Sequence, residues 1–175
     1  MKQFVRIVGA IVVAGAIASS QAAASDLHSF TASLLGGVGG SIDEDAAGFS
    51  NLSWQLGFGV QREVHTQFGM RLGRIDMSST TVSNPLSNSA LNYLLLGGEY
   101  RTQEGLYESG LFIGLGAYKL DGSTSETSIG AALGVTGDFE LTRKWTVLVE
   151  LTGHVTQLEA AKIFATGLAG LALHF

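Results

Sequence analysis

The sequence predicts an all-β protein whose strands close into an eight-stranded antiparallel up-and-down transmembrane β-barrel. Three observations lead to this fold class. The first residues have the layout of a secretion signal, several later segments alternate apolar and polar residues, and the 175 residues include 24 glycines but only one proline. Because a sheet in lipid satisfies all its backbone groups only when it closes on itself, strands that cross a membrane imply a barrel.

The amino-terminal segment resembles a cleaved export signal. Lys2 and Arg6 form a basic region, residues 7–18 are apolar, and Ala22 to Ala24 form a small-residue cleavage site before Ser25. The alternative is a retained anchor helix, but the apolar stretch is shorter than the roughly 20 residues that span a bilayer. The sequence therefore predicts a signal peptide at 1–24 and one domain at 25–175.

The charge balance limits the range of partners. The chain has 10 basic and 15 acidic residues, giving a formal net charge of −5, and residues 1–24 hold two of the basic residues and no acidic one. Phosphate binding along a nucleic acid needs a clustered excess of Lys and Arg, so no nucleic-acid partner is expected. The chain contains no cysteine.

Residues 52–60 alternate most clearly, with Leu52, Trp54, Leu56, Phe58 and Val60 separated by polar or small residues. Nine residues at a period of two match a tilted membrane strand whose apolar face touches lipid and whose small polar face lines the interior. A soluble barrel or sandwich would alternate too, but it would carry more charge and turn its apolar face inward. The predicted strands cover residues 28–40, 50–61, 64–75, 90–101, 106–120, 127–141, 145–155 and 163–175.

The connections predict how the barrel is oriented. Links at 61–63, 102–105 and 142–144 are tight, whereas 41–49, 76–89, 121–126 and 156–162 are longer and polar. In outer-membrane barrels the tight turns face the periplasm and the longer loops face outward. Aromatic residues near the tight-turn ends fit an interfacial girdle, although an internal core would also explain them: Tyr100, Tyr107, Trp145 and Phe175.

Several stretches support a resemblance to a known group of proteins. They are residues 93–101, 110–118, 134–145 and the terminal Leu171-Ala-Leu-His-Phe175. Together with the signal segment, they resemble the eight-stranded outer-membrane β-barrel domain proteins, the OmpA/OmpX/Opa-like group. This resemblance implies a location in the outer membrane of a Gram-negative bacterium. It also implies that Leu171, Leu173 and Phe175 form the signal read by the barrel-assembly machinery, after delivery by periplasmic chaperones.

The interior-facing polar residues are the candidates for a lumen network. Charges inside a narrow barrel must be paired or hydrogen-bonded, because an unpaired buried charge costs several kcal/mol. The sequence predicts a structural network that fills the lumen, with a gated or small pore as the alternative. Its members are Gln55, Gln67, Arg71, Glu99, Asp138, Glu150, Thr152 and His154.

One stretch suggests an enzyme. His154, Thr156 and Gln157 faintly resemble the His-x-Ser-Asn stretch of outer-membrane lipid A deacylases, with Glu159 as the nearest acid. A triad needs its members in mutual contact and facing the lipid headgroups, whereas the phase of His154 predicts an inward side chain. We therefore expect no catalytic residues.

No cofactor or metal ligand is expected either. The four histidines are scattered without ligand spacing, and Asp43 to Asp45 lack the alternation of a calcium loop. Arg74 differs from the lumen candidates because its phase is outward and near the outer leaflet. It could contact lipopolysaccharide phosphates, or simply pair with Asp76.

The sequence as a whole predicts a non-enzymatic outer-membrane protein with a structural role in the envelope or a role in surface interaction. A lipid A-modifying enzyme and a small porin or adhesin are the alternatives. The sequence does not determine the oligomeric state.

Overall fold

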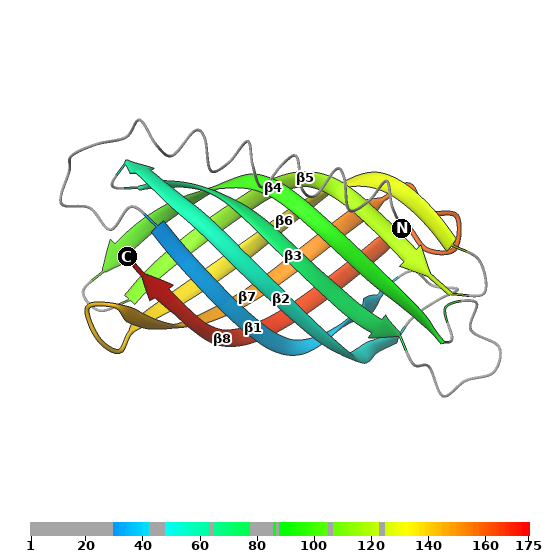
Figure 1. The fold of residues 1–175 in the computed structure, drawn as a ribbon, viewed down its shortest axis with the longest axis horizontal. Coiled ribbons are helices and arrows are strands. Elements are labelled where there is room, and N and C mark those ends of the chain that lie inside the picture. The colour runs from blue at the N-terminus through cyan, green and yellow to red at the C-terminus, as the bar shows by residue number, and fades with distance from the viewer. Residues whose placement is uncertain are drawn as a thin grey trace.

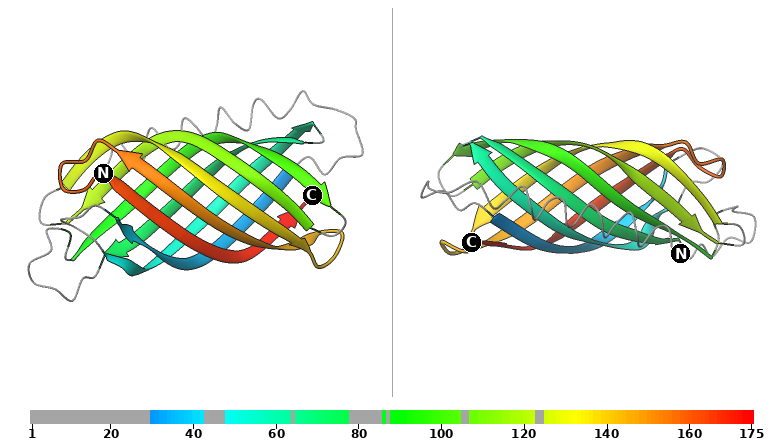
Figure 2. Two further views of the ribbon diagram at one scale, coloured as in Figure 1. Left: turned by 180° about the vertical axis from the view of Figure 1, so that it is seen from behind. Right: turned by 45° about the horizontal axis from the view of Figure 1, so that its top comes forward.

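The computed structural model describes residues 30–42, 48–63, 65–77, 86, 88–104, 107–122 and 125–175. These residues form one closed barrel in which every strand pairs with its neighbours in chain order and β8 pairs with β1. Figures 1 and 2 show the tilted strands wrapping around one axis from three sides. The predicted signal peptide at 1–24 lies outside the described residues.

All eight predicted strands are present, with ends that differ from the predictions by a few residues. No helix in the described ranges is long and apolar enough to cross a membrane. The strands are β1 (Phe30–Ser41), β2 (Gly48–Glu63), β3 (Thr66–Met77), β4 (Ser89–Glu104), β5 (Tyr107–Asp121), β6 (Ser125–Glu140), β7 (Trp145–Thr156) and β8 (Ile163–His174).

The barrel has two distinct ends. One, here called the turn end, carries the β2–β3, β4–β5 and β6–β7 connections and the last residue of the chain (Figure 1). At this end the Phe175 amide donates to the Phe30 carbonyl at 2.9 Å, and the His174 amide donates to the Lys144 carbonyl at 2.8 Å. The opposite end, here called the loop end, carries the other four connections.

The outer surface of the barrel is apolar. Leu52, Leu115 and Ile129 are 67%, 69% and 68% exposed, and large apolar side chains from every strand are exposed in the same way. A water-soluble protein would turn these side chains inward, so the outer surface is one suited to lipid. The soluble-barrel alternative is therefore wrong.

Aromatic residues at the turn end also point outward. Tyr100, Tyr107, Trp145 and Phe175 are between 39% and 60% exposed, as an interfacial girdle requires. They do not form an internal core, and the alternative interpretation of these residues is wrong.

The lumen differs from the sequence expectation in one respect. Its turn-end half holds the buried charged residues beside a small apolar cluster of Leu35, Leu148, Leu168 and Ala172, and its loop-end half is filled by apolar side chains. Part of this apolar filling comes from β4, where Leu91, Tyr93 and Leu95 face inward. Residues on both faces of this strand are apolar. The strand pattern alone does not reveal which of its two apolar faces fills the lumen.

Candidate functional site: the barrel lumen

Arg71 on β3 is the centre of the polar half of the lumen. Its Nη2 lies 3.0 Å from Glu99 Oε2 on the neighbouring β4, and its Nη1 lies 2.9 Å from Glu150 Oε1 on β7. The second contact is an ion pair without hydrogen-bond geometry. The guanidinium also stacks over Phe112, with Cζ 3.4 Å from the ring centroid. Because β3 and β7 are not neighbours in the barrel, Arg71 ties opposite walls together.

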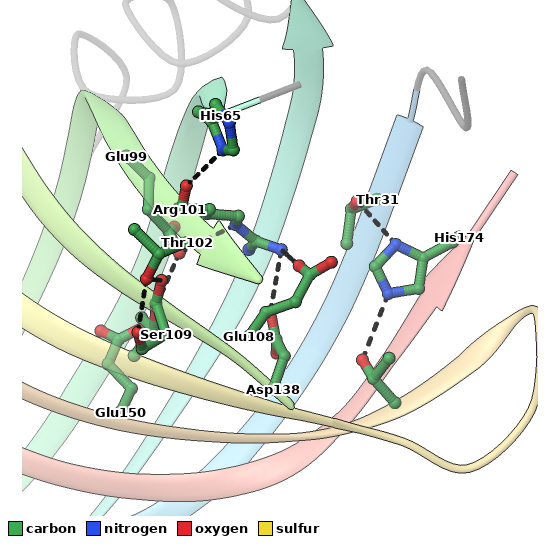
Figure 3. A network of polar contacts seen from close by, with 12 residues as sticks. Thr31, His65, Glu99, Arg101, Thr102, Glu108, Ser109, Asp138, Glu150 and His174 are labelled. Atoms are coloured by element: carbon green, nitrogen blue, oxygen red, sulfur yellow. Dashed lines mark hydrogen bonds and ion pairs between the residues drawn. The ribbon is translucent and has the colours of Figure 1, made fainter. Parts of the chain in front are cut away.

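Arg101 forms a second ion-pair centre nearer the turn end (Figure 3). Its Nε lies 3.1 Å from Glu99 Oε1, and its Nη1 lies 2.8 Å from Asp138 Oδ2 and 3.5 Å from Glu108 Oε2. Glu99 is therefore shared by both arginines. The second oxygen of Asp138, Oδ1, is buried and makes no hydrogen bond to the described residues.

The sequence prediction did not include Arg101 and Glu108. Arg101 follows Glu99 by two residues on β4, and Glu108 lies four residues before the inward Phe112 on β5. A period of two extended to the strand ends places both side chains inward. Both residues lie within the predicted strands 90–101 and 106–120, but the prediction did not follow the alternation as far as the strand ends.

Neutral side chains add hydrogen bonds to two of the buried carboxylates, Glu99 and Glu150. Gln55 Nε2 donates to Glu150 Oε2 at 3.2 Å, and its Oε1 accepts from the Tyr93 hydroxyl at 2.9 Å. Thr152 donates to Glu150 at 2.8 Å, and Thr136 donates to Glu99 at 2.6 Å. Hydrogen bonds of this kind offset the desolvation of a buried ion pair.

Gln67 is buried beside this network. The structure shows no hydrogen bond between its side chain and the described residues of the network. It lines a cavity of about 40 Å³ together with Arg71, Glu99 and Glu150. A space of this size holds water molecules but no larger solute. The structure therefore brings Gln55, Arg71, Glu99, Asp138 and Glu150 into one network and leaves Gln67 at its edge.

Inward glycines make room for the large side chains of the lumen. A Cβ on Gly73 would lie 2.7 Å from Cε2 of Tyr93, and one on Gly110 would lie 2.5 Å from Glu99 Oε1. Both distances are too short for a real side chain. These glycines are needed because an eight-stranded barrel has little interior room.

His154 lies deeper, at the junction with the apolar half. It is fully buried, its Nδ1 lies 3.1 Å from the Tyr118 hydroxyl, and its Nε2 lies 3.3 Å from Thr166 Oγ1. The Tyr93 ring packs against the imidazole at a centroid distance of 4.9 Å. His154 is thus a hydrogen-bonded core residue rather than an exposed base.

The remaining members of the suggested triad are not assembled around His154. Thr156 faces inward and donates to the Ala161 carbonyl at 3.3 Å, while Gln157 and Glu159 are exposed. Neither ring nitrogen of His154 contacts Thr156. The structure therefore does not bring the suggested nucleophile Thr156 or the acid Glu159 to His154, and the hydroxyls that do contact the ring, those of Tyr118 and Thr166, are buried with it.

Apolar side chains fill the loop-end half of the lumen and form what we call the apolar plug, which reaches the polar half at Phe112 beneath Arg71. Its residues come from β3, β4, β5, β6 and β8 and from two connections between strands. They are Ile75, Met77, Leu86, Leu91, Tyr93, Leu95, Phe112, Tyr118, Leu120, Ala132, Leu158, Ala161 and Phe164.

Single residues from two connections complete the plug at the mouth of the barrel. Leu158 and Ala161, between β7 and β8, are 0% and 3% exposed, and Leu86, before β4, is 1% exposed. The Leu158 amide donates to Thr156 Oγ1 at 3.3 Å. The Ser89 amide donates to the Leu86 carbonyl at 3.1 Å across a turn in which Asn88 has φ 58°, a left-handed conformation that Asn tolerates.

On the outer surface, Arg74 lies at the loop end, where its Nε is 2.5 Å from Asp76 Oδ1 and both side chains are 40% exposed. The strand register places it in one row with Asn92 and Lys119. Lys119 forms an ion pair with Asp121, which also accepts a hydrogen bond from Asn92 at 3.1 Å. This row is a polar band above the apolar surface.

The last strand closes the barrel and has apolar residues on both faces, with Phe164 and Leu168 buried in the lumen. Leu171 and Phe175 are 48% and 60% exposed, while Ala172 on the opposite face is 1% exposed. Leu171 pairs with Leu34 of β1 and with Val147 of β7.

Within the described residues, no group of three or more His, Asp or Glu side chains is placed to hold a metal ion.

Comparison with solved structures places this architecture among known barrels. Neisserial surface protein A matches with a TM-score of 0.67 and 13% sequence identity, covering 83% of this chain and 97% of that one. The fold is that of the eight-stranded outer-membrane β-barrels. The amino-terminal β-barrel domain of OprF from Pseudomonas aeruginosa matches with a TM-score of 0.57 and 12% identity, covering 83% and 96% of the two chains.

A third solved structure of this fold is Ail, the attachment invasion locus protein of Yersinia pestis. It matches with a TM-score of 0.54 and 14% identity, over 84% of this chain and 99% of that one. No protein-family model matches the sequence, and no curated protein sequence does. The likeness is therefore one of fold, because the identities are low.

Proposed function

We propose that this protein is a non-enzymatic outer-membrane β-barrel that contributes to envelope structure or to contacts at the cell surface and does not conduct ions. The observation that carries this proposal is the sealed lumen. Ion pairs tie opposite walls in the turn-end half, and the apolar plug fills the loop-end half. An ion would have to break buried charge pairs and then cross an apolar segment.

Conductance tests this proposal directly. Purified protein refolded into planar bilayers should give no stable open level, whereas a large water-filled porin in the same bilayers gives steady steps. A steady ohmic current from this barrel would overturn the sealed-lumen argument and favour the small-porin alternative.

The proposed location is the outer membrane, with the turn end in the periplasm. The apolar surface, the outward aromatics at the turn end and the likeness to outer-membrane barrels support this orientation. The proposal includes export by the signal at 1–24, delivery by periplasmic chaperones and insertion by the barrel-assembly machinery, which reads Leu171, Leu173 and Phe175. Fractionation should recover the protein with outer membranes, and boiling should change its mobility on a gel.

At the loop end, the proposal assigns Arg74 to a contact with lipopolysaccharide phosphates. Arg74 and Lys119 occupy one row on the outward face, above the apolar surface, where lipid A phosphates lie. Both cations already have carboxylate partners, Asp76 and Asp121. Replacing Arg74 with Met should reduce the amount of lipopolysaccharide that copurifies with the protein, whereas replacing the turn residue Arg143 should not.

Surface interaction is the second part of the proposed role. Ail, which shares the fold, has been solved with the heparin analogue sucrose octasulfate. At the loop end of this barrel, the described residues Leu86, Leu158 and Ala161 of two connections are buried in the mouth. A structural role is therefore favoured over adhesion. Binding of whole cells to immobilised heparin, compared with a deletion strain, distinguishes the two.

The enzyme alternative is disfavoured by the burial of His154. Mass spectrometry of lipid A from cells with and without the protein should give the same acylation pattern. A change that disappears in the His154→Ala variant, while that variant still folds, would restore the deacylase-like interpretation.

A further inference from the structure

A groove of about 670 Å³ crosses the lipid-facing surface of β4 to β7 near the turn end. It lies on the outer side of the barrel wall, and Gly110 and Thr136, which face the network on the inner side, also border it. The role proposed for the barrel does not use it.

The strand register explains why a groove forms here. Thr102, Ser109 and Gly137 pair directly across β4, β5 and β6 and form a row of small residues. Larger residues flank this row on both sides. Tyr100, Leu111 and Val135 lie on the side toward the middle of the barrel, and Tyr107 and Phe139 lie on the side of the turn end.

The groove is polar at one end and apolar at the other. Thr102 Oγ1 and Ser109 Oγ lie 2.8 Å apart (Figure 3), close to the strand ends that border the β4–β5 connection. Along the row, Gly137 is followed by Val149, which lies further from the end of its strand. The groove therefore runs from a polar start near the membrane boundary toward the hydrocarbon.

The Tyr107 side chain leans across this groove. A Cβ on Gly137 would lie 3.2 Å from the Tyr107 hydroxyl oxygen, and the Tyr107 ring packs against Phe139 at a centroid distance of 4.9 Å. The Tyr107 hydroxyl makes no hydrogen bond to any residue that the structure describes. A tyrosine hydroxyl at a membrane boundary is stabilised by an acceptor from the lipid.

We propose that this groove binds one glycerophospholipid of the periplasmic leaflet, an assignment of leaflet that rests on the orientation proposed above. An acyl chain lies along Gly137, Val135 and Val149. The glycerol ester and phosphate oxygens accept hydrogen bonds from the hydroxyls of Tyr107 and Ser109, while Thr102 donates to Ser109. The groove is comparable in volume to small-molecule sites. Its polar-to-apolar order matches that of a lipid entering the membrane from the boundary.

Native mass spectrometry of protein released from lipid nanodiscs tests the proposal. The nanodiscs contain phosphatidylethanolamine or phosphatidylglycerol, so that the two headgroups are compared. Wild-type protein should retain one phospholipid. Gly137→Leu fills the groove and should lower the retained fraction about tenfold. Gly167→Leu is the matched control, because Gly167 lies on the outward face of β8 with open space around it.

A second variant covers the case in which Gly137→Leu does not fold. Tyr107→Phe keeps the ring and removes only the hydroxyl, and it should lower retention by about threefold. Retention of both headgroups indicates recognition of the shared glycerol ester, and retention of one indicates headgroup recognition; each supports the site. The proposal is overturned if wild type retains no lipid, if both groove variants retain as much as Gly167→Leu, or if the groove is covered by a second copy of the chain.

Discussion

The two halves of the lumen are sealed by different physical means. In the turn-end half, two arginines and four carboxylates form ion pairs across the lumen, whereas in the loop-end half apolar side chains pack without charges. Buried ion pairs are sensitive to the loss of a single partner, because the other charge remains buried. Apolar packing loses stability in proportion to the space left behind. The same barrel therefore closes its interior by two means. The ion-paired half is sensitive to the loss of one charge, and the apolar half is sensitive to the loss of side-chain volume.

The largest expected effect comes from removing the shared cation of the polar half. Arg71→Met leaves Glu99 and Glu150 without one of their partners and should lower the free energy of unfolding by about 3–5 kcal/mol. Denaturant unfolding in lipid vesicles measures this. Arg74→Met is the matched control on the same strand, where an exposed pair with Asp76 is worth at most about 1 kcal/mol. Equal losses for the two variants would contradict the assignment of Arg71 as the centre of the network.

The next effect concerns the apolar plug. Leu158→Ala removes a fully buried side chain from the barrel mouth and should cost about 2–4 kcal/mol. The control is Leu141→Ala in the β6–β7 turn, where the side chain is 59% exposed. Because the polar half remains sealed, the Leu158→Ala barrel should still show no conductance. An open channel in this variant would mean that the plug alone seals the lumen.

A smaller effect is expected at the junction of the two halves. Tyr118→Phe removes the hydroxyl that contacts His154 Nδ1 and should cost about 1–2 kcal/mol, since the imidazole nitrogen stays buried. Tyr100→Phe, on the lipid-facing surface, should change stability little. If Tyr118→Phe leaves the stability unchanged, the hydrogen bond between Tyr118 and His154 does not stabilise the junction of the two halves.

The strands, their inward and outward faces and the polar lumen residues were accessible from the sequence. Arg71, Glu150 and His154 each alternate with outward apolar neighbours, and a period of two places them inward whatever their partners are. The inward direction of Glu99 follows from its charge. The pairing of Arg71 with Glu150 could not be predicted, because it depends on the closure that brings β3 opposite β7.

The apolar plug was missed for a different reason. Leu86, Leu158 and Ala161 lie between strands, where no periodicity indicates a buried side chain, and the inward face of β4 resembles its outward face. The groove on the outer surface also could not be predicted from the sequence, because only the register of three strands brings Thr102, Ser109 and Gly137 into one row.

The sequence by itself determined that this chain forms eight alternating strands with an apolar surface, because a two-residue period and the exclusion of open sheets from lipid leave one architecture. Only the tertiary structure decided which side chains seal the interior and where the groove on the outer surface lies. Those features depend on which residues of non-neighbouring strands meet across the lumen, and on which small residues align in register. Both are consequences of closure, and closure is a property of the whole barrel.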